Sequence, residues 1–542
     1  MKEDDLRRGG RRSDERGPGP ASEGPAEQLG LLDIVGLTVG AIVGADIYVA
    51  SAFGSGRLGP AALLVWALAG GVALILALTF ARCAMYVPKA GGPYAYVGMA
   101  YGQTAGFLVG WTLWVAEWTS LSVFPIAFVR YLAVLFPGMN STEIVLAKIA
   151  FIGFITLTNF YGARLAGTVN DLLTAFKLAP LALLTLLGLI FLLTEPQAAA
   201  AHLTPFAPKG LAGIGDALVP IFWAYAGFEL ATIPAGEVRR PTRTIPLAIM
   251  LGMAVVTVFY LLTNLVLLST VRWEVLAAAD APLTLGIESI LGRLVPALVG
   301  VGGLFMTIGA VVSIAGSDES GTLATSRLAY AMAADGHLPP SFARLHPRYR
   351  TPYVALLFQN GTALVAALVG TLGTLIRVTV FSLAVAYLLT SLAAIKLERS
   401  HKHGPSVEAE AVPDRRATGW LVAVARRSMR YVPYGGVLAS LLLLSHVGWV
   451  PAVLGLALLG VGFLVYSYLS PEQELVEIKT WITSRRYQYL KVYDTGQRFL
   501  AWPLSWWRRR GAERRHRQPL PDQAEPRPAS MADVESDDRG GF

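Results

Sequence analysis

The chain has 542 residues, of which 54% are hydrophobic and 15% are charged, and its formal net charge is +8. Soluble domains carry about 25% charged residues, so this composition is typical of a protein that lies within a membrane. The single cysteine, Cys83, excludes an internal disulfide and any metal site built from several cysteines. The basic residues flank apolar segments, which indicates membrane topology rather than binding to nucleic acid.

Apolar segments long enough to cross a bilayer occur about twelve times along the chain. We therefore expect an all-α integral membrane protein with about 12 transmembrane helices. Residues 1–30 are expected to form a disordered N-terminal tail, residues 31–470 the transmembrane domain, and residues 471–542 a partly disordered C-terminal tail. The expected spans are 31–53, 60–86, 94–125, 142–162, 168–194, 211–235, 246–270, 289–320, 351–371, 374–396, 431–448 and 450–469.

Basic residues concentrate in every second loop between the expected spans. Because basic loops stay on the cytoplasmic side, this pattern predicts a multi-pass protein of the cell membrane with both termini in the cytoplasm. In the C-terminal tail, Trp506 and Trp507 precede Arg508 to Arg510, a combination that suits either contact with membrane lipid or an unstructured, solvated tail. The basic loops contain Arg82 with Lys89, Arg164, Arg239 to Arg243, Arg344 to Arg350, and the segment 397–430.

The first expected span contains two glycines four residues apart, Gly40 and Gly44, followed by Asp46. Such a glycine pair alone is typical of close helix packing. An ionisable group at bilayer depth costs a few kcal/mol, so it normally faces a cavity or a charged partner. Glycine also weakens a helix. The two features together predict a helix that is broken to expose its backbone to a ligand.

A second interruption, from Trp223 to Glu229, lies in the sixth expected span. Paired interruptions five helices apart indicate two inverted five-helix repeats, with the last two helices outside the repeat. Amides freed near the first break suit a carboxylate, because helix N-termini present unpaired N–H groups. The expected substrate-binding residues are Val43, Gly44, Ala45 and Asp46 in the first break, and Phe222, Ala224 and Gly227 in the second.

Three further polar positions lie in apolar segments. Lys177, beside Pro180, either reaches the membrane surface or is a buried amine that exchanges protons, with Asp46 as its candidate partner. Asp46 is equally a candidate partner for a substrate amine. Glu229 either bonds the amides exposed by the second break or takes part in coupling and gating. Asp318 and Glu319, at the end of the eighth span, are expected to be solvated at the interface rather than to form an ion site.

The sequence contains no pattern that indicates an enzyme. There is no HExxH motif, no phosphate-binding glycine loop, and no intramembrane pairing of serine with histidine. We therefore expect no catalytic residues, no cofactor, no bound metal and no nucleic-acid partner.

Several stretches occur in the order in which a known family has them. They are 40–48, Pro88 to Tyr96, Gly106 to Trp111, Ala224 to Glu229, Glu237 to Pro246, and Ser326 with Arg327 followed by Ala333 to Pro339. Over residues 31 to about 470, the chain thus resembles the amino acid–polyamine–organocation superfamily of permeases. The resemblance implies the leucine-transporter fold, alternating access, and a substrate site between broken helices one and six.

The resemblance also implies that Lys177 matches the fifth-helix lysine of proton-coupled members. Two positions depart from the family pattern: Asp46 stands where the family has a glycine, and Arg82 stands where it usually has a glutamate. An aspartate at that site either repels a substrate carboxylate, attracts a cationic amine, or pairs with Lys177.

We predict a secondary active transporter that carries amino acids or related amines by alternating access and is coupled to protons. A polyamine or organic-cation carrier is the closest alternative, favoured if Asp46 points into the pocket. A sensor that binds amino acids without transporting them is the alternative from a different class.

Overall fold

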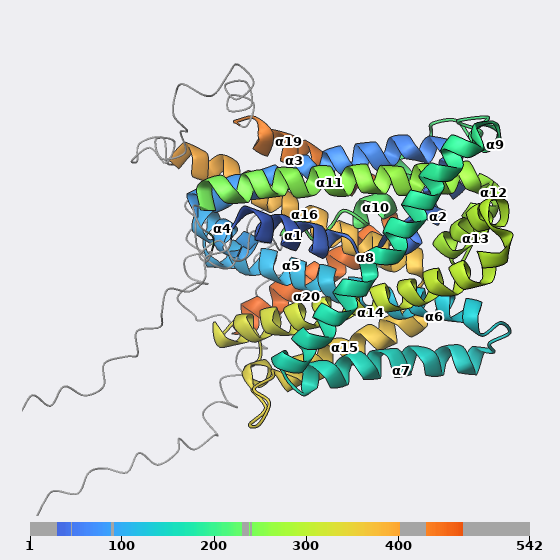
Figure 1. Cartoon of the computed structure of the whole chain (residues 1–542). Coiled ribbons are helices and arrows are strands. Elements are labelled where there is room, and N and C mark those ends of the chain that lie inside the picture. The colour runs from blue at the N-terminus through green and yellow to red at the C-terminus, as the bar shows by residue number, and fades with distance from the viewer. Residues whose placement is uncertain are drawn as a thin grey trace, which may run out of the picture. The chain divides into compact units, whose positions relative to one another are not determined.

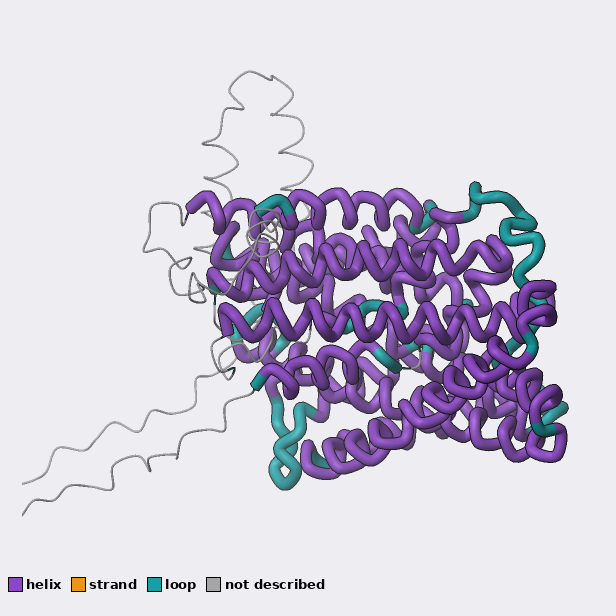
Figure 2. Tube along the Cα trace, turned by 45° about the horizontal axis from the view of Figure 1, so that its top comes forward, coloured by secondary structure: helices purple, strands orange, loops and turns teal. Residues whose placement is uncertain are grey.

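The computed structural model describes residues 30–44, 46–87, 92–229, 238, 241–400 and 430–469, and the regular elements in these ranges are all helices (Figures 1 and 2). The side chains of Leu37, 163–172, 174–177 and 241–243 lie outside this description. The helices are α1 (Leu31–Ile42), α2 (Asp46–Leu58), η1 (Gly59–Ala61), α3 (Ala62–Tyr86), α4 (Gly92–Tyr101), α5 (Gln103–Leu121), α6 (Phe124–Leu135), α7 (Ser141–Phe160), α8 (Ala163–Thr194), α9 (Pro196–His202), α10 (Ile214–Trp223), α11 (Pro241–Thr270), α12 (Trp273–Ala278), α13 (Pro282–Leu294), η4 (Pro296–Leu298), α14 (Val299–Ala334), η5 (Pro340–Ala343), α15 (Tyr353–Val369), α16 (Leu372–Ser400), α19 (Val432–His446) and α20 (Trp449–Leu469).

Seven helices of the described chain are long and apolar enough to cross a membrane. An eighth span is formed if the second half of α8 is joined to α9, from which it bends by 107°. Four shorter apolar helices remain, namely α1, α10, α15 and α19. Two of these four, α1 and α10, end at the interruptions that the sequence predicts, which explains why they are short.

Two of the expected spans have the wrong boundaries. The expected span 94–125 is divided, because Gly102 adopts a φ of +94° between α4 and α5, and the candidate span then runs from Gln103 to Leu135. A left-handed backbone of this kind favours glycine and ends α4. The expected span 289–320 begins too early and ends too early. Pro296 starts a 3-10 turn after α13, so the long helix α14 begins at Val299 and extends to Ala334.

The long helices run side by side, with α9, α12 and α13 gathered at one end of the bundle and α4 near the other (Figure 1). α14 packs on α8, α16 on α5, and α11 on both α3 and α1. Small residues allow some of these close approaches: Gly309 of α14 lies against the ring of Pro180 in α8. The core is largely aliphatic and aromatic, with Trp66, Tyr225 and Tyr260 fully enclosed or nearly so.

Large apolar side chains cover the outer faces of the outer helices. In α7, Leu146 is 58% exposed and Phe154 is 49% exposed, and in α20 Val453 and Leu464 are similarly open. Contiguous exposed apolar surface of this extent is unfavourable in water but matches the hydrocarbon core of a bilayer. The apolar helices and their apolar outer faces define a multi-pass membrane protein.

Candidate functional site

The first span is broken between α1 and α2. α1 ends at Ile42, Val43 leaves the helical conformation with φ −75° and ψ 97°, and α2 begins at Asp46. The last carbonyls of a helix and the first amides of the next lack helical partners at such a break. One freed carbonyl is satisfied from a distant helix, because the Tyr260 hydroxyl of α11 donates to the Ile42 oxygen at 3.0 Å. The predicted break is therefore present, and the bundle supports it.

The sixth span is broken as well. α10 ends at Trp223, and the chain then turns through residues 224–227 before one short helical turn at Phe228 and Glu229. Gly227 has a φ of +110°, a conformation that side chains rarely adopt. Phe222 and Ala224 are fully buried on either side of Trp223.

The two breaks touch each other. A Cβ atom on Gly227 would lie 2.8 Å from the backbone oxygen of Ala41, the next-to-last residue of α1. No flexible side chain stands at this contact, since the neighbouring atoms belong to backbone. Only glycine at position 227 satisfies both the left-handed conformation and the close approach. Segments that are separated by nearly two hundred residues thus meet where Gly227, one of the expected lining residues, touches the end of α1 just before Val43.

Gly44 and Gly40 differ in their surroundings. A Cβ atom on Gly44 would lie 2.5 Å from the Ser317 hydroxyl oxygen of α14, so α14 closes on the first break there. At Gly40 a Cβ atom would meet nothing within 4 Å. Gly40 therefore has open space where a side chain would stand, whereas Gly44 is held against a neighbouring helix. Ala45, between Gly44 and α2, lies outside the described residues.

Glu229 bonds to the second break. Its Oε2 atom accepts a hydrogen bond from the Gly227 amide at 3.1 Å and another from the Tyr387 hydroxyl of α16 at 3.0 Å. The side chain is only 4% exposed. Of the two roles that the sequence left open for Glu229, the geometry displays the bonding of an exposed amide. Tyr387 was not anticipated, although a polar-tipped aromatic in an apolar span is a usable signal.

Asp46 is the first residue of α2 and is half-buried. A carboxylate in the first turn of a helix is stabilised by the amides and the positive end of the helix dipole. The Asp46 charge therefore lies where a substrate carboxylate would otherwise be attracted.

Lys177 lies in α8, three residues before Pro180. Its side chain is outside the described residues, so its pairing with Asp46 stays a prediction.

Aromatic rings surround the first break. Tyr260 contacts both Trp66 and Tyr225, with ring centroids 5.5 Å and 5.2 Å apart, and the Tyr225 hydroxyl donates to the Trp66 backbone oxygen at 2.9 Å. These three residues come from α11, α3 and the second break. The cluster fixes the end of α1, through Tyr260, and the turn after α10, through Tyr225, against the same two helices.

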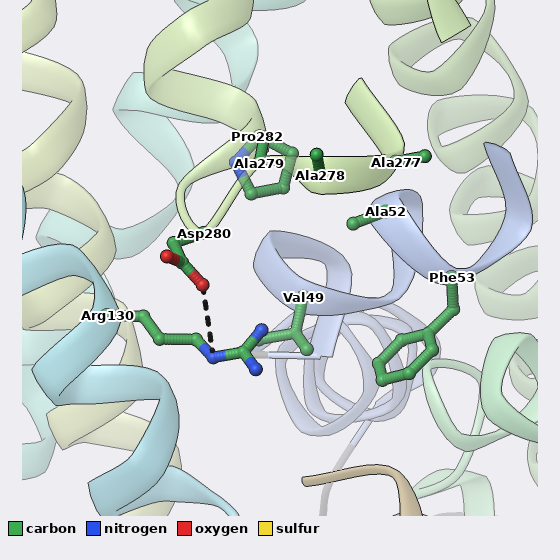
Figure 3. Close-up of a pocket in the computed structure, with 9 residues that line it drawn as sticks. All are labelled: Val49, Ala52, Phe53, Arg130, Ala277, Ala278, Ala279, Asp280 and Pro282. Carbon is green, nitrogen blue, oxygen red and sulfur yellow. Dashed lines mark ion pairs between the residues drawn. The ribbon is translucent and has the colours of Figure 1, made fainter. Parts of the chain in front are cut away.

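A cavity of about 270 Å³ lies beside α2, one turn and more beyond Asp46 (Figure 3). Figure 3 shows Arg130 of α6 reaching toward Asp280, with a distance of 3.5 Å between Arg130 Nε and Asp280 Oδ1. Both side chains are partly exposed, so the ion pair itself is weak. Sequence reasoning did not identify this pocket, because its wall combines distant segments: Val49, Ala52, Phe53, Arg130, Ala277, Ala278, Ala279, Asp280 and Pro282.

Comparison with known proteins identifies the family of this chain. A family model described as amino acid permease matches residues 29–474, so the chain belongs to the amino acid permease family. The branched-chain amino acid permease BcaP of Bacillus subtilis is 25% identical over 81% of this chain and 92% of the permease. The serine/threonine exchanger SteT of the same organism is 28% identical over 70% of this chain and 85% of the exchanger.

A human protein, the large neutral amino acids transporter small subunit 2, is 30% identical over 67% of this chain and 68% of that subunit. The names of these three relatives describe transporters, and none describes an enzyme. The family assigned from the sequence motifs is thereby confirmed.

Proposed function

We propose that this protein is a secondary active transporter of amino acids, and that it works by alternating access. The observation that carries the proposal is the contact between the two broken spans, Gly227 against Ala41, in a chain whose relatives are named amino acid transporters. Broken helices at the middle of a membrane present amides and carbonyls to a substrate. The backbone from Val43 to Asp46 and from Phe222 to Gly227 forms the substrate site.

The first turn of α2 supplies the recognition of the amino acid backbone. Its amides have no helical partners and bind the substrate carboxylate. The Asp46 side chain, at the same helix end, attracts the substrate amine. The cavity beside α2 lies farther along the same helix, and we place it on the substrate's route to the site.

The helix contacts support twelve spans arranged as two inverted repeats. If the first span corresponds to the sixth, the second to the seventh, the third to the eighth and the fifth to the tenth, then two of the extensive helix contacts have counterparts. α5 packs on α16 as α14 packs on α8, and α1 packs on α11 as α10 packs on α3. Under this arrangement α19 and α20 form spans eleven and twelve, outside the repeat.

The transport domain extends over residues 31–470, which the family match at 29–474 supports. We place both tails in the cytoplasm of the cell, on the argument from basic loops. The tails at 1–29 and 470–542, with the proposed lipid contact near Trp506, lie outside the described residues.

Coupling to protons is part of the proposal. Lys177 corresponds to the lysine of proton-coupled family members, and Glu229 is a buried acid bonded to the second break. Glu229 lies at the second break itself. The helix of Lys177, α8, packs on α14 and α11, and these two helices contact the first break through Ser317 and Tyr260.

A carrier of polyamines or organic cations is the second candidate, favoured by the half-buried acid at position 46. A binding screen separates the two. The thermal unfolding temperature of the purified protein is measured with the standard amino acids and with a series of polyamines. We expect an increase with one group of amino acids and none with polyamines. Stabilisation by polyamines alone would replace the amino acid transporter with the cation carrier.

A further inference from the structure

A buried polar cluster lies between α7, α14 and α15, which pack against one another (Figure 1). Asp318 and Glu319 are adjacent on α14, and each is 0% exposed. The expectation that this pair is solvated at the interface is therefore wrong. The reason is that α14 continues for four more turns to Ala334, so its acidic pair lies inside the bundle and not at a helix end.

The hydrogen bonds of Glu319 are consistent with a protonated acid. Its Oε2 atom lies 2.7 Å from the Thr158 hydroxyl of α7, and that hydroxyl also lies 2.9 Å from the Ile155 backbone oxygen. A hydroxyl has one hydrogen and cannot donate to both acceptors. If Glu319 carries a proton, it donates to Thr158, and Thr158 then donates to Ile155. Both contacts are satisfied only in that case.

Asp318 makes weaker hydrogen bonds than Glu319 does. Its Oδ1 atom has only a 3.5 Å contact with the Thr322 hydroxyl, which lies equally far from the Asn360 side-chain oxygen of α15. Contacts of that length are weak. The second oxygen of each acid, Asp318 Oδ2 and Glu319 Oε1, is buried and has no hydrogen-bond partner among the described residues.

Gln359 adds an independent signal from the facing helix. It is 0% exposed, and its amide nitrogen donates to the Thr322 backbone oxygen at 3.1 Å, which holds the side chain in the cluster. Its Oε1 atom is also buried without a described partner. Three buried acceptor oxygens in one small region therefore lack donors among the described side chains. Unsatisfied buried acceptors are costly, and a bound proton or cation removes that cost.

No described cation neutralises the pair. Neither acid takes part in an ion pair among the described side chains, and α15 contains no charged residue. In α7, the Lys148 ammonium group donates instead to the Ala367 backbone oxygen. The other charged residues on α14 and on the helices packed against it are Glu117 in α5, Arg130 in α6, Glu143 in α7, Glu288 and Arg293 in α13, Arg327 in α14, and Arg164, Asp171 and Lys177 in α8. The side chains of these three α8 residues lie outside the described part of the structure.

We propose that Asp318 and Glu319 form a second binding site for a proton that drives transport, in addition to the proton-exchanging amine proposed at Lys177. The inference rests on the proposed function and adds a site to it. The cluster is connected to the substrate site through α14 itself, because Ser317, the residue before Asp318, contacts Gly44 in the first break. A change in the charge of the pair shifts α14 against that break.

The test uses the full chain in proteoliposomes, with Glu319→Gln and Asp318→Asn as isosteres of the protonated acids. In the wild type, an inward proton gradient increases amino acid accumulation. In each variant, we expect accumulation with the gradient to equal accumulation without it, whatever exchange rate the variant retains. Glu143→Gln is the matched control: Glu143 is an exposed acid in the capping box of α7, and glutamine preserves that box. This control should respond to the gradient as the wild type does.

If both variants retain the full proton response, Asp318 and Glu319 are not a proton site. If a sodium gradient alone drives transport by the wild type, the driving cation is not a proton. If the wild type transports nothing, the proposed function fails, and a second measurement still decides this inference. The infrared carbonyl band of protonated carboxyl groups should titrate in the wild-type protein and weaken in both variants. An unchanged band would refute the site independently of transport.

Discussion

Gly227 is the residue at which the two broken spans depend on each other. Replacing it with alanine adds a Cβ atom 2.8 Å from the Ala41 oxygen and imposes a φ of +110° on a residue that disfavours it. Holding a side chain in such a conformation costs about 1–3 kcal/mol. We expect Gly227→Ala to lower the thermal unfolding temperature and to abolish transport.

The matched control is Gly40→Ala, in the same broken region but with nothing within 4 Å of the added atom. Alanine also favours a helix more than glycine does. This variant should unfold at or above the wild-type temperature. Equal loss of stability in the two variants would show that the contact between the breaks has no special importance.

Asp46 carries the charge by which this chain departs from its family. With Asp46→Gly, the negative charge leaves the first turn of α2, so we expect the preference to move toward substrates with a carboxylate and no extra amine. A change of about 1.4 kcal/mol corresponds to a tenfold shift in relative affinity. Competition of unlabelled amino acids and amines against a labelled substrate measures it. Asp46→Asn isolates the charge from the backbone effect of glycine. If both variants keep the wild-type preference and rate, Asp46 has only a structural role.

Substitution of Lys177, in α8, tests the proposed coupling to protons. We expect Lys177→Ala to abolish the response of uptake to a proton gradient, because the amine that gains and loses a proton is gone. Uptake into proteoliposomes with and without the gradient provides the measurement, with Lys177→Arg as the variant that keeps a fixed charge. Gradient-driven uptake that is unchanged in Lys177→Ala would remove Lys177 from the coupling mechanism.

At the scale of elements, an ion pair between two helices explains why an arginine stands at position 82. The guanidinium of Arg82 in α3 lies 3.1 Å from the Glu398 carboxylate in α16, and both side chains are mostly buried. The family's usual glutamate is therefore replaced by a cation that is matched on another helix. Removing one member of such a charged hydrogen bond costs roughly 1.5–3 kcal/mol.

The charge-swapped pair tests this explanation. Arg82→Glu alone should lower the thermal unfolding temperature, since it places two acids together. The double variant Arg82→Glu with Glu398→Arg should recover most of the loss. A double variant that is no more stable than Arg82→Glu would show that Arg82 acts through other contacts.

At the scale of the whole molecule, orientation is testable with single cysteines. The natural thiol of Cys83 is fully buried, so Cys83→Ala gives a background without a reactive thiol. Cysteines at Glu274, in α12, and at Arg243, at the start of α11, should be labelled from opposite sides of the membrane. An impermeant thiol reagent applied to intact cells should label only position 274. Labelling of both from one side would refute the topology.

Much of this architecture could be predicted from the sequence because the signals are local. The glycines and acid at 40–46, and the interruption after Trp223, each weaken a helix where they stand. The contact between Gly227 and Ala41 could not be derived in this way, since it depends on how two distant segments pack. The same limit explains the error at Asp318 and Glu319. Adjacent acids resemble an interfacial pair until Thr158 and Gln359, from other helices, are placed around them.

The central claim is that amino acids pass through this protein at the joined breaks. Counterflow tests it most directly: proteoliposomes loaded with unlabelled amino acid are diluted into a trace of the labelled form. We predict transient accumulation of label in the wild type and none in Gly227→Ala. Binding of the amino acid to the wild-type protein without any accumulation of label would contradict the account and identify a sensor instead.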